Sequence, residues 1–92
     1  MIDVKEAVKT ATDYLGQLYE LAQLQDILLE EVSLSDDEKY WYVTLGFSRP
    51  LPSTDPMQKL TEGILKRYQR EYKVFQIDSA TGQVRSMKIR AA

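Results

Sequence analysis

Residues 39–47 read KYWYVTLGF, and this stretch decides the fold that we expect. Its side chains change character at every second position, which is the period of a β-strand with one buried face. One face carries the large apolar side chains of Trp41, Val43, Leu45 and Phe47. Because burying each of these contributes roughly 1.5–3 kcal/mol, we expect this face to meet the core. The other face carries Tyr40, Tyr42 and Thr44.

The residues before this strand predict a hairpin partner for it. Apolar side chains at Leu28, Val32 and Leu34 lie at even offsets, and the polar run SDDE at residues 35–38 has the composition of a turn. We therefore expect strands at about 27–34 and 39–48. The apolar residues of 24–34 also fit a helical spacing, so the alternative is that a preceding helix continues through residue 34.

The N-terminal part of the chain predicts an amphipathic helix from about residue 4 to about residue 23. Asp3 followed by Glu6 has the spacing of a capping box, with Asp3 as the N-cap. Behind it, apolar residues recur at steps of four and three, the pattern of a helix with one buried stripe. This stripe comprises Val4, Val8, Ala11, Leu15, Leu18 and Ala22.

After the central strand, prolines at positions 50 and 52 interrupt the extended pattern. Residues 54–64 predict either a short helix, capped by Asp55 with Pro56 at its first position, or an irregular connection. From about residue 66 or 68 the alternation of a strand returns, with Phe75 and Ile77 on one side. A last strand, about 83–90, carries Met87 and Ile89 in phase.

The turn between these two strands lies in IDSATGQV, residues 77–84. A plain hairpin centred on this stretch would place Phe75 and Met87 on opposite faces. One extra residue at the turn corrects the parity, and a type I turn followed by a left-handed glycine adds such a residue as a G1 bulge. We therefore predict a positive φ at Gly82, a turn started by the side chain of Asp78, and Phe75 and Met87 on one face.

The run YKVFQIDSATGQVRS, Tyr72–Ser86, resembles the C-terminal hairpin of PepSY-type domains, in which a strand ending in Asp leads through small residues to a Thr-Gly pair. The layout of a helix followed by strands is similar to the wider cystatin-like arrangement, in which a helix lies across a curved antiparallel sheet. The resemblance implies a small α+β binding module. It carries over no catalytic residue.

Composition excludes several kinds of chemistry. The chain has no Cys and no His, which removes thiolate sites, the commonest general base and the commonest metal ligand. We expect no enzyme, no catalytic residue, no cofactor and no metal; the acids at 30–31 and 36–38 are interpreted as a solvated edge and turn. The N-terminus MIDVKEAVKT mixes acids and lysines, so we expect no signal peptide, no membrane span and a cytoplasmic protein.

Charge is distributed unevenly along the chain. Residues 1–46 carry three basic and ten acidic side chains, a balance of −7, whereas residues 47–92 carry nine basic and four acidic, a balance of +5. We expect the two halves to pack together and neutralise each other. The alternative is a basic face for an acidic partner or nucleic acid, centred on Lys66, Arg67, Arg70 and Lys73 with their neighbouring tyrosines. The acidic pI of about 5.1 favours the first interpretation.

These patterns together predict one α+β domain, residues 1–92, with an N-terminal helix packed on a four-stranded antiparallel sheet and a long connection between the second and third strands. The expected functional surface is the sheet face away from the helix, or a sheet edge, acting on a protein partner or on a second copy of the chain. Its expected contact residues are Tyr40, Tyr42, Arg70, Tyr72 and Val74. The alternatives are a small-ligand carrier with a pocket between helix and sheet, and nucleic-acid binding through the basic C-terminal half.

Overall fold

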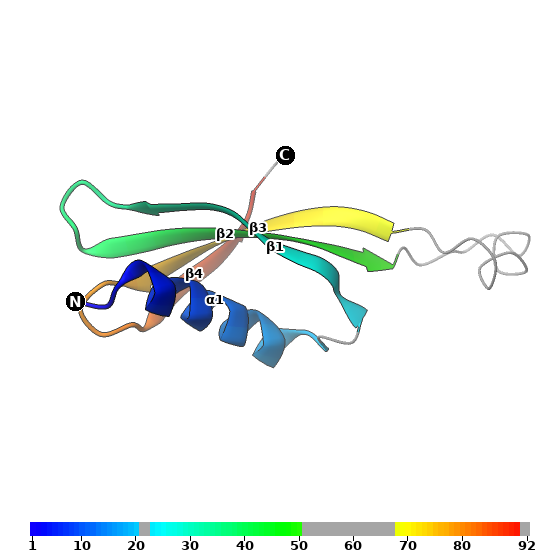
Figure 1. Cartoon of the computed structure of the whole chain (residues 1–92), viewed down its shortest axis with the longest axis horizontal. Coiled ribbons are helices and arrows are strands. Elements are labelled where there is room, and N and C mark those ends of the chain that lie inside the picture. Colours follow the sequence, from blue (N-terminus) through cyan, green and yellow to red (C-terminus); the bar gives the residue numbers. More distant parts are fainter. Residues whose placement is uncertain (21–22, 51–67, 91–92) are drawn as a thin grey trace, which may run out of the picture.

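The computed structural model describes residues 1–20, 23–50 and 68–90. It has one helix, α1 (Val4–Leu18), and four strands, β1 (Gln25–Leu34), β2 (Tyr40–Pro50), β3 (Tyr68–Asp78) and β4 (Val84–Ile89). The strands form one antiparallel sheet in the order β1-β2-β3-β4, and α1 lies on one of its faces (Figure 1). The predicted α+β fold is confirmed, and the alternative of a helix through residue 34 is wrong. The helix predicted within 54–64 lies outside the described residues.

The helix begins where its cap predicts. The Asp3 carboxylate accepts the backbone N–H of Glu6 at 2.8 Å, which satisfies one of the free donors of the first turn. The helix ends at Leu18, earlier than the predicted residue 23, because Tyr19 adopts an extended backbone (φ −127°, ψ 149°). From there the ring of Tyr19 packs against Phe47, with ring centroids 5.9 Å apart.

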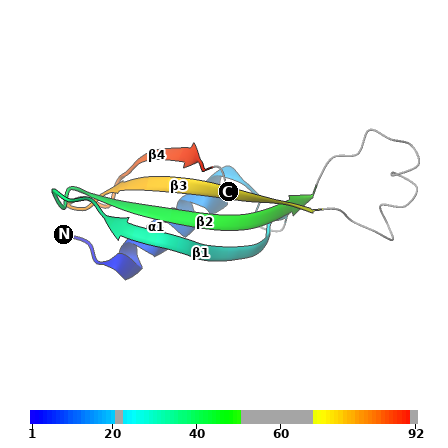
Figure 2. The ribbon, with the colours of Figure 1, turned by 90° about the horizontal axis from the view of Figure 1, so that it is seen from above.

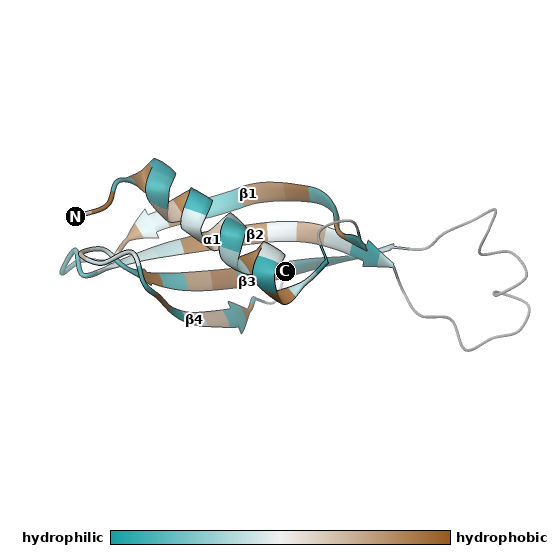
Figure 3. Cartoon of the chain, turned by 90° about the horizontal axis from the view of Figure 1, so that it is seen from below, coloured by the Kyte–Doolittle hydropathy of each residue, from teal (hydrophilic) through white to brown (hydrophobic). Residues whose placement is uncertain are grey.

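The buried stripe of α1 is rotated from the predicted one. Ala7, Ala11 and Leu15 have no exposed surface, so the predicted positions Ala11 and Leu15 are in the core. The predicted positions Val4 and Leu18 are instead 40% and 51% exposed, and Ala22 lies outside the described residues. Alanines at the contact let the helix axis approach the sheet, where large side chains fill the space between the layers. Figure 3 shows α1 lying across the sheet. The small residues of the helix and the large residues of the strands therefore complement each other.

The sheet side of the core comes from the odd-numbered residues of the two central strands, as the alternation predicts. Fully buried side chains on this side are Val43, Leu45, Phe47, Phe75 and Ile77. Trp41 is half-buried against the same core and donates its indole N–H to the carbonyl of Ile2 at 3.1 Å. The pattern of KYWYVTLGF thus specifies both the strand and its buried face.

The β3–β4 hairpin confirms the predicted parity but corrects where the extra residue lies. Gly82 has φ of 75°, and Phe75 pairs with Met87 on the helix side. The G1 bulge predicted at the turn is wrong, because the N–H of Asp78 bonds to the carbonyl of Gln83 at 2.8 Å and closes a plain loop. The register instead shifts inside β4, where Ile77 pairs with Val84 but Gln76 pairs with Ser86.

One predicted core residue of the last strand is not in the core. Ile89 pairs with Lys73 and lies on the helix side by parity, but it is 80% exposed. It stands at the end of an edge strand, where no described neighbour covers it.

Within IDSATGQV, Ser79 makes hydrogen bonds to two other parts of the chain. Its side chain is 4% exposed, and its hydroxyl donates to the carbonyl of Glu38 at 2.6 Å. Its N–H bonds to the carbonyl of Lys39 at 2.9 Å, and its carbonyl accepts the N–H of Ile2 at 2.7 Å. Ser79 therefore joins the N-terminal residues to both hairpin turns, at the end of the sheet that carries the N-terminus in Figure 1.

The carboxylate of Asp78 holds the turn beside Ser79. It accepts the backbone N–H groups of Ala80 at 2.8 Å and Thr81 at 3.0 Å, and Arg85 lies 3.3 Å away. The bond from Thr81, then that from Ala80 and the nearby Arg85, lower the pKa of Asp78 below its ordinary value of 3.8. A lowered carboxylate pKa stabilises the fold above the unfolded pKa, and this contribution is lost as the pH falls through the folded pKa.

We therefore expect the Asp78→Asn variant to lose less stability on acidification than the wild type does. Asparagine keeps an oxygen that accepts both turn N–H groups, but it does not titrate. Urea unfolding at neutral pH and at a pH below 3.8 measures the loss for each protein. Equal losses in the two proteins would contradict this role of Asp78.

Candidate functional site

The candidate surface is the outer face, defined as the side of the sheet away from α1. Among the described residues no helix covers it, and it faces the viewer in Figure 2. Its centre is built from the even-numbered residues of β2 and β3, because their odd-numbered neighbours point into the core. Cross-strand pairs place all five predicted contact residues on it: Tyr40 pairs with Asp78, Tyr42 with Gln76, Thr44 with Val74, Gly46 with Tyr72 and Ser48 with Arg70.

The half of the outer face near the hairpin turns carries Tyr40 and Tyr42 as half-buried rings. The hydroxyl of Tyr42 accepts a hydrogen bond from the amide of Gln76 at 3.3 Å, and Ser86 donates to the same amide's oxygen at 3.3 Å. This row links β2, β3 and β4 through neutral groups. It leaves two half-buried tyrosine side chains on a side of the sheet that no described helix covers.

In the other half, Arg70 lies across the sheet from β3 towards β1. Its guanidinium contacts Glu30 at 2.9 Å, the hydroxyl of Ser48 at 3.4 Å and the backbone carbonyl of Asp26. The guanidinium carbon also lies 5.9 Å from the centre of the Tyr72 ring, within the range of a cation–π contact. The predicted contact residue Arg70 is thus engaged within the chain.

Gly46 makes room for this crossing. A Cβ atom at position 46 would lie 2.6 Å from the Oε1 of Glu30 and 2.9 Å from the Nη2 of Arg70. Both distances are shorter than van der Waals contact, so any larger residue would displace the ends of these two flexible side chains. The glycine of KYWYVTLGF therefore leaves space for the ion pair between Arg70 and Glu30.

A second arginine crosses the outer face from the opposite edge. Arg90, directly after β4, contacts Glu31 of β1 at 2.8 Å and the hydroxyl of Thr44 at 3.4 Å. Thr44 is only 4% exposed. Both crossing arginines belong to the basic half of the chain and both glutamates to the acidic half, as the expectation of mutual neutralisation predicts.

The five predicted contact residues share a face but not a single cluster. Tyr40 and Tyr42 lie near the hairpin turns. Arg70 and Tyr72 lie in the other half of the outer face, where Arg70 pairs with Glu30. Tyr72 is opposite Gly46, four residues along β2 from Tyr42, which is about 14 Å in an antiparallel strand. Arg90 and Glu31 are not among the site residues that the sequence predicts. The only signal for them was the uneven charge of the two halves.

The proposed basic surface for nucleic acid is only partly described. Lys66 and Arg67 lie outside the described residues, and Arg70 is paired with Glu30. Of the neighbouring cations, Arg49 lies 3.1 Å from Glu71. The described part of this region therefore has its arginines neutralised by carboxylates.

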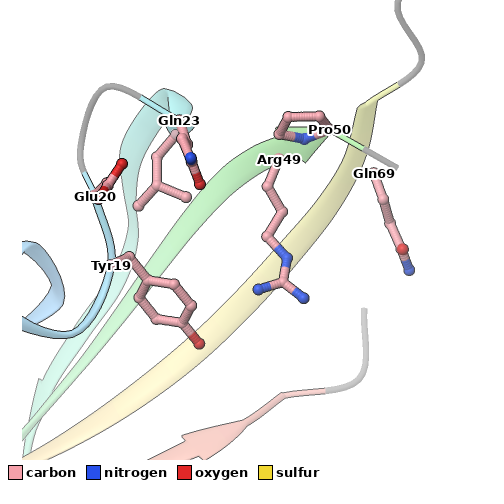
Figure 4. Close-up of a pocket in the computed structure, with 7 residues that line it drawn as sticks. Tyr19, Glu20, Gln23, Arg49, Pro50 and Gln69 are labelled. Atoms are coloured by element: carbon pink, nitrogen blue, oxygen red, sulfur yellow. The ribbon is translucent and has the colours of Figure 1, made fainter. Parts of the chain in front are cut away.

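A shallow hollow of about 210 Å³ lies at the C-terminal end of α1, beside the ends of β2 and β3 (Figure 4). Arg49 stands between its walls, with its guanidinium 5.8 Å from the centre of the Tyr19 ring. The carrier hypothesis expects a pocket between helix and sheet, and this hollow lies elsewhere. Between α1 and the sheet, the fully buried side chains of Leu15, Phe47 and Phe75 occupy the contact.

One acidic side chain of the first hairpin turn, that of Asp37, has local partners. Asp37 accepts hydrogen bonds from the hydroxyl of Ser35 at 2.7 Å and from the N–H of Lys39 at 3.0 Å, and these bonds lower its pKa. In the part of the chain that the structure describes, no three Asp, Glu, His or Cys side chains gather as metal ligands do.

Comparison with protein-family models, with curated proteins and with solved structures found no match to this chain. Within the described ranges, no helix has the length and apolar character needed to cross a lipid bilayer.

Proposed function

We propose that this protein is a non-catalytic binding module that docks on a protein partner through the outer face, with Tyr40 and Tyr42 as anchors. One observation carries this proposal. In the described residues α1 covers the sheet on one side only, yet the half-buried side chains of Tyr40 and Tyr42 lie on its other side. Tyrosines supply a large contact area at little entropic cost, and they are enriched among residues that dominate binding energies.

The remainder of the outer face supports the same use. The two crossing ion pairs hold charged side chains in fixed positions, so a partner meets a preformed surface rather than mobile arginines. Val74, opposite Thr44, lies between the tyrosine row and the crossing of Arg70. We propose that this binding module acts in the cytoplasm and that its fold resembles those of PepSY-like and cystatin-like domains. The experiment below tests the docking surface and requires neither of these two proposals.

The test compares two positions that carry a photo-reactive amino acid, one at Tyr42 on the outer face and one at Gln17 on the exposed side of α1. Irradiation in host cells is expected to capture a protein at position 42 and not at position 17. With that protein purified, the Tyr42→Ala variant is expected to bind about 30-fold or more weakly. The Tyr42→Phe variant, which keeps the ring, is expected to bind nearly as the wild type does.

Two results would contradict outer-face docking. One is capture at position 17 with none at position 42. The other is a Kd for Tyr42→Ala equal to that of the wild type, measured on variants whose circular dichroism shows the native fold.

A further inference from the structure

The two edge strands of the sheet carry opposite charges. β1 (Gln25–Leu34) contains three acidic residues and no basic one, and β4 (Val84–Ile89) contains two basic residues and no acidic one. Arg90 follows β4 directly and adds a third cation. Four of these edge charges are already paired within the chain: Glu30 with Arg70, Glu31 with Arg90, and Arg85 with Asp78. Lys88 is therefore the cation through which the β4 edge attracts an acidic edge, and the fit of the two edges rests mainly on their backbone groups and apolar rows.

The free backbone groups of β4 belong to Met87 and Ile89. The N–H of Asp78 bonds to the Gln83 carbonyl, and the N–H of Arg90 bonds to the Tyr72 carbonyl, both at 2.8–2.9 Å. Even-numbered residues of β3 therefore turn their backbone groups towards β4. In an antiparallel ladder, the intervening pairs Phe75–Met87 and Lys73–Ile89 then leave the N–H and C=O of Met87 and Ile89 pointing outward.

The same alternation identifies the free groups of β1. Because the even-numbered residues of β3 direct their backbone groups to β4, its odd-numbered residues form backbone hydrogen bonds with the odd-numbered residues of β2. The even-numbered residues of β2 therefore form their backbone hydrogen bonds with β1. Since Tyr42 pairs with Ser33, the groups of Val32 and Leu34 point outward. Both register shifts of β1 lie before Glu31, so the stretch 31–34 is a regular edge.

Side chains at the two edges also match face by face. On the helix side, β4 presents Met87 and the 80% exposed Ile89, and β1 presents Val32 and Leu34. On the outer face, Lys88 and Arg90 stand at one edge and Glu31 and Ser33 at the other. Both free edges thus combine an apolar row on one face with a polar row on the other.

We propose that a second copy of this chain binds head to tail, with its β1 edge added to the β4 edge of the first copy. β1 and β4 run in opposite directions within the sheet, so a second copy in the same orientation pairs antiparallel. Parity places Ile89 opposite Val32 of the second copy and Met87 opposite Leu34 of the second copy. Lys88 then faces Ser33 of the second copy, next to Glu31 of the second copy. This contact lies at the edges, so it stands or falls independently of docking on the outer face.

A head-to-tail contact leaves one free β1 edge and one free β4 edge however many copies are joined, unless a ring closes. We therefore expect the average mass, measured by sedimentation at low salt, to rise with protein concentration beyond that of two copies. Added salt is expected to reverse this rise, because it screens exposed charges. A mass that stays at one copy up to about 1 mM, where contacts of only about 4 kcal/mol populate complexes, would overturn the proposal. A mass that stops at two copies would overturn the head-to-tail arrangement.

Ser33 offers a matched pair of variants, because it is exposed on the outer face of β1 and faces Lys88 of a neighbouring copy in this arrangement. The Ser33→Glu variant is expected to associate more tightly than the wild type, and Ser33→Lys more weakly. We expect their Kd values to differ about ten-fold. Adding Lys88→Glu to Ser33→Lys is expected to restore association, because the charges at the contact are then exchanged. Equal association of the two Ser33 variants, or no recovery in the exchanged pair, would overturn the proposal.

Discussion

Replacing Phe75 by alanine is expected to lower the free energy of unfolding by about 3–5 kcal/mol. The side chain has no exposed surface, and the ring of Tyr14 contacts it edge to face with centroids 6.2 Å apart. Alanine would leave a cavity between α1 and the middle of the sheet. The strand β3 cannot move to fill it, because backbone hydrogen bonds join β3 to β2 and β4. Small domains have a total stability of about 5–15 kcal/mol, so urea unfolding followed by circular dichroism measures this loss easily.

The control for Phe75→Ala is Ile89→Ala. Ile89 is also a large apolar residue on the helix side of the sheet, but it is 80% exposed. Its replacement is expected to change the stability by no more than about 0.5 kcal/mol. Similar losses for the two variants would mean that the core does not lie where the register places it.

The Ala11→Leu variant is expected to lose about 1–3 kcal/mol of stability through overpacking. Ala11 has no exposed surface and lies at the centre of the buried stripe of α1, between Ala7 and Leu15. A leucine there would push the helix away from the sheet, although leucine itself is a good helix former. Thermal or urea unfolding measures the loss.

For this variant the control is Gln17→Leu, which adds an apolar side chain of the same size on the exposed side of α1. We expect the stability of Gln17→Leu to remain within about 0.5 kcal/mol of the wild type. If Ala11→Leu proved as stable as this control, the close approach of α1 to the sheet would be refuted.

Much of the fold follows from local patterns. The alternation of KYWYVTLGF predicts both β2 and its buried face, and the Asp3 cap predicts the start of α1. The end of α1 depends on a contact that local patterns do not contain, because Tyr19 leaves the helix to pack on Phe47. The exposure of Ile89 likewise depends on where the helix lies over the sheet.

The sequence pattern predicts which residues lie on the outer face, but it does not predict which side chains contact each other there. Parity alone places Tyr40, Tyr42, Tyr72 and Val74 on one side of the sheet. The partners of Arg70 and Arg90 depend on how strands far apart in the chain align, and on how far a guanidinium reaches across two or three strands. The role of Gly46 can be recognised only once that alignment is known, because the space beside its Cα is occupied by the side chain of Glu30.

The position of Ser79 has a consequence for the order of folding. Its bonds to Ile2, Lys39 and Glu38 join segments that are separated by nearly the whole chain in one case and by about half of it in the others. A contact between such distant segments gains little until the intervening chain is already ordered, because the entropy of closing the loop opposes it. The two hairpins can form from local contacts, whereas the attachment of the N-terminal residues at Ser79 requires both of them. We therefore expect this attachment to be among the last native contacts to form as the chain folds.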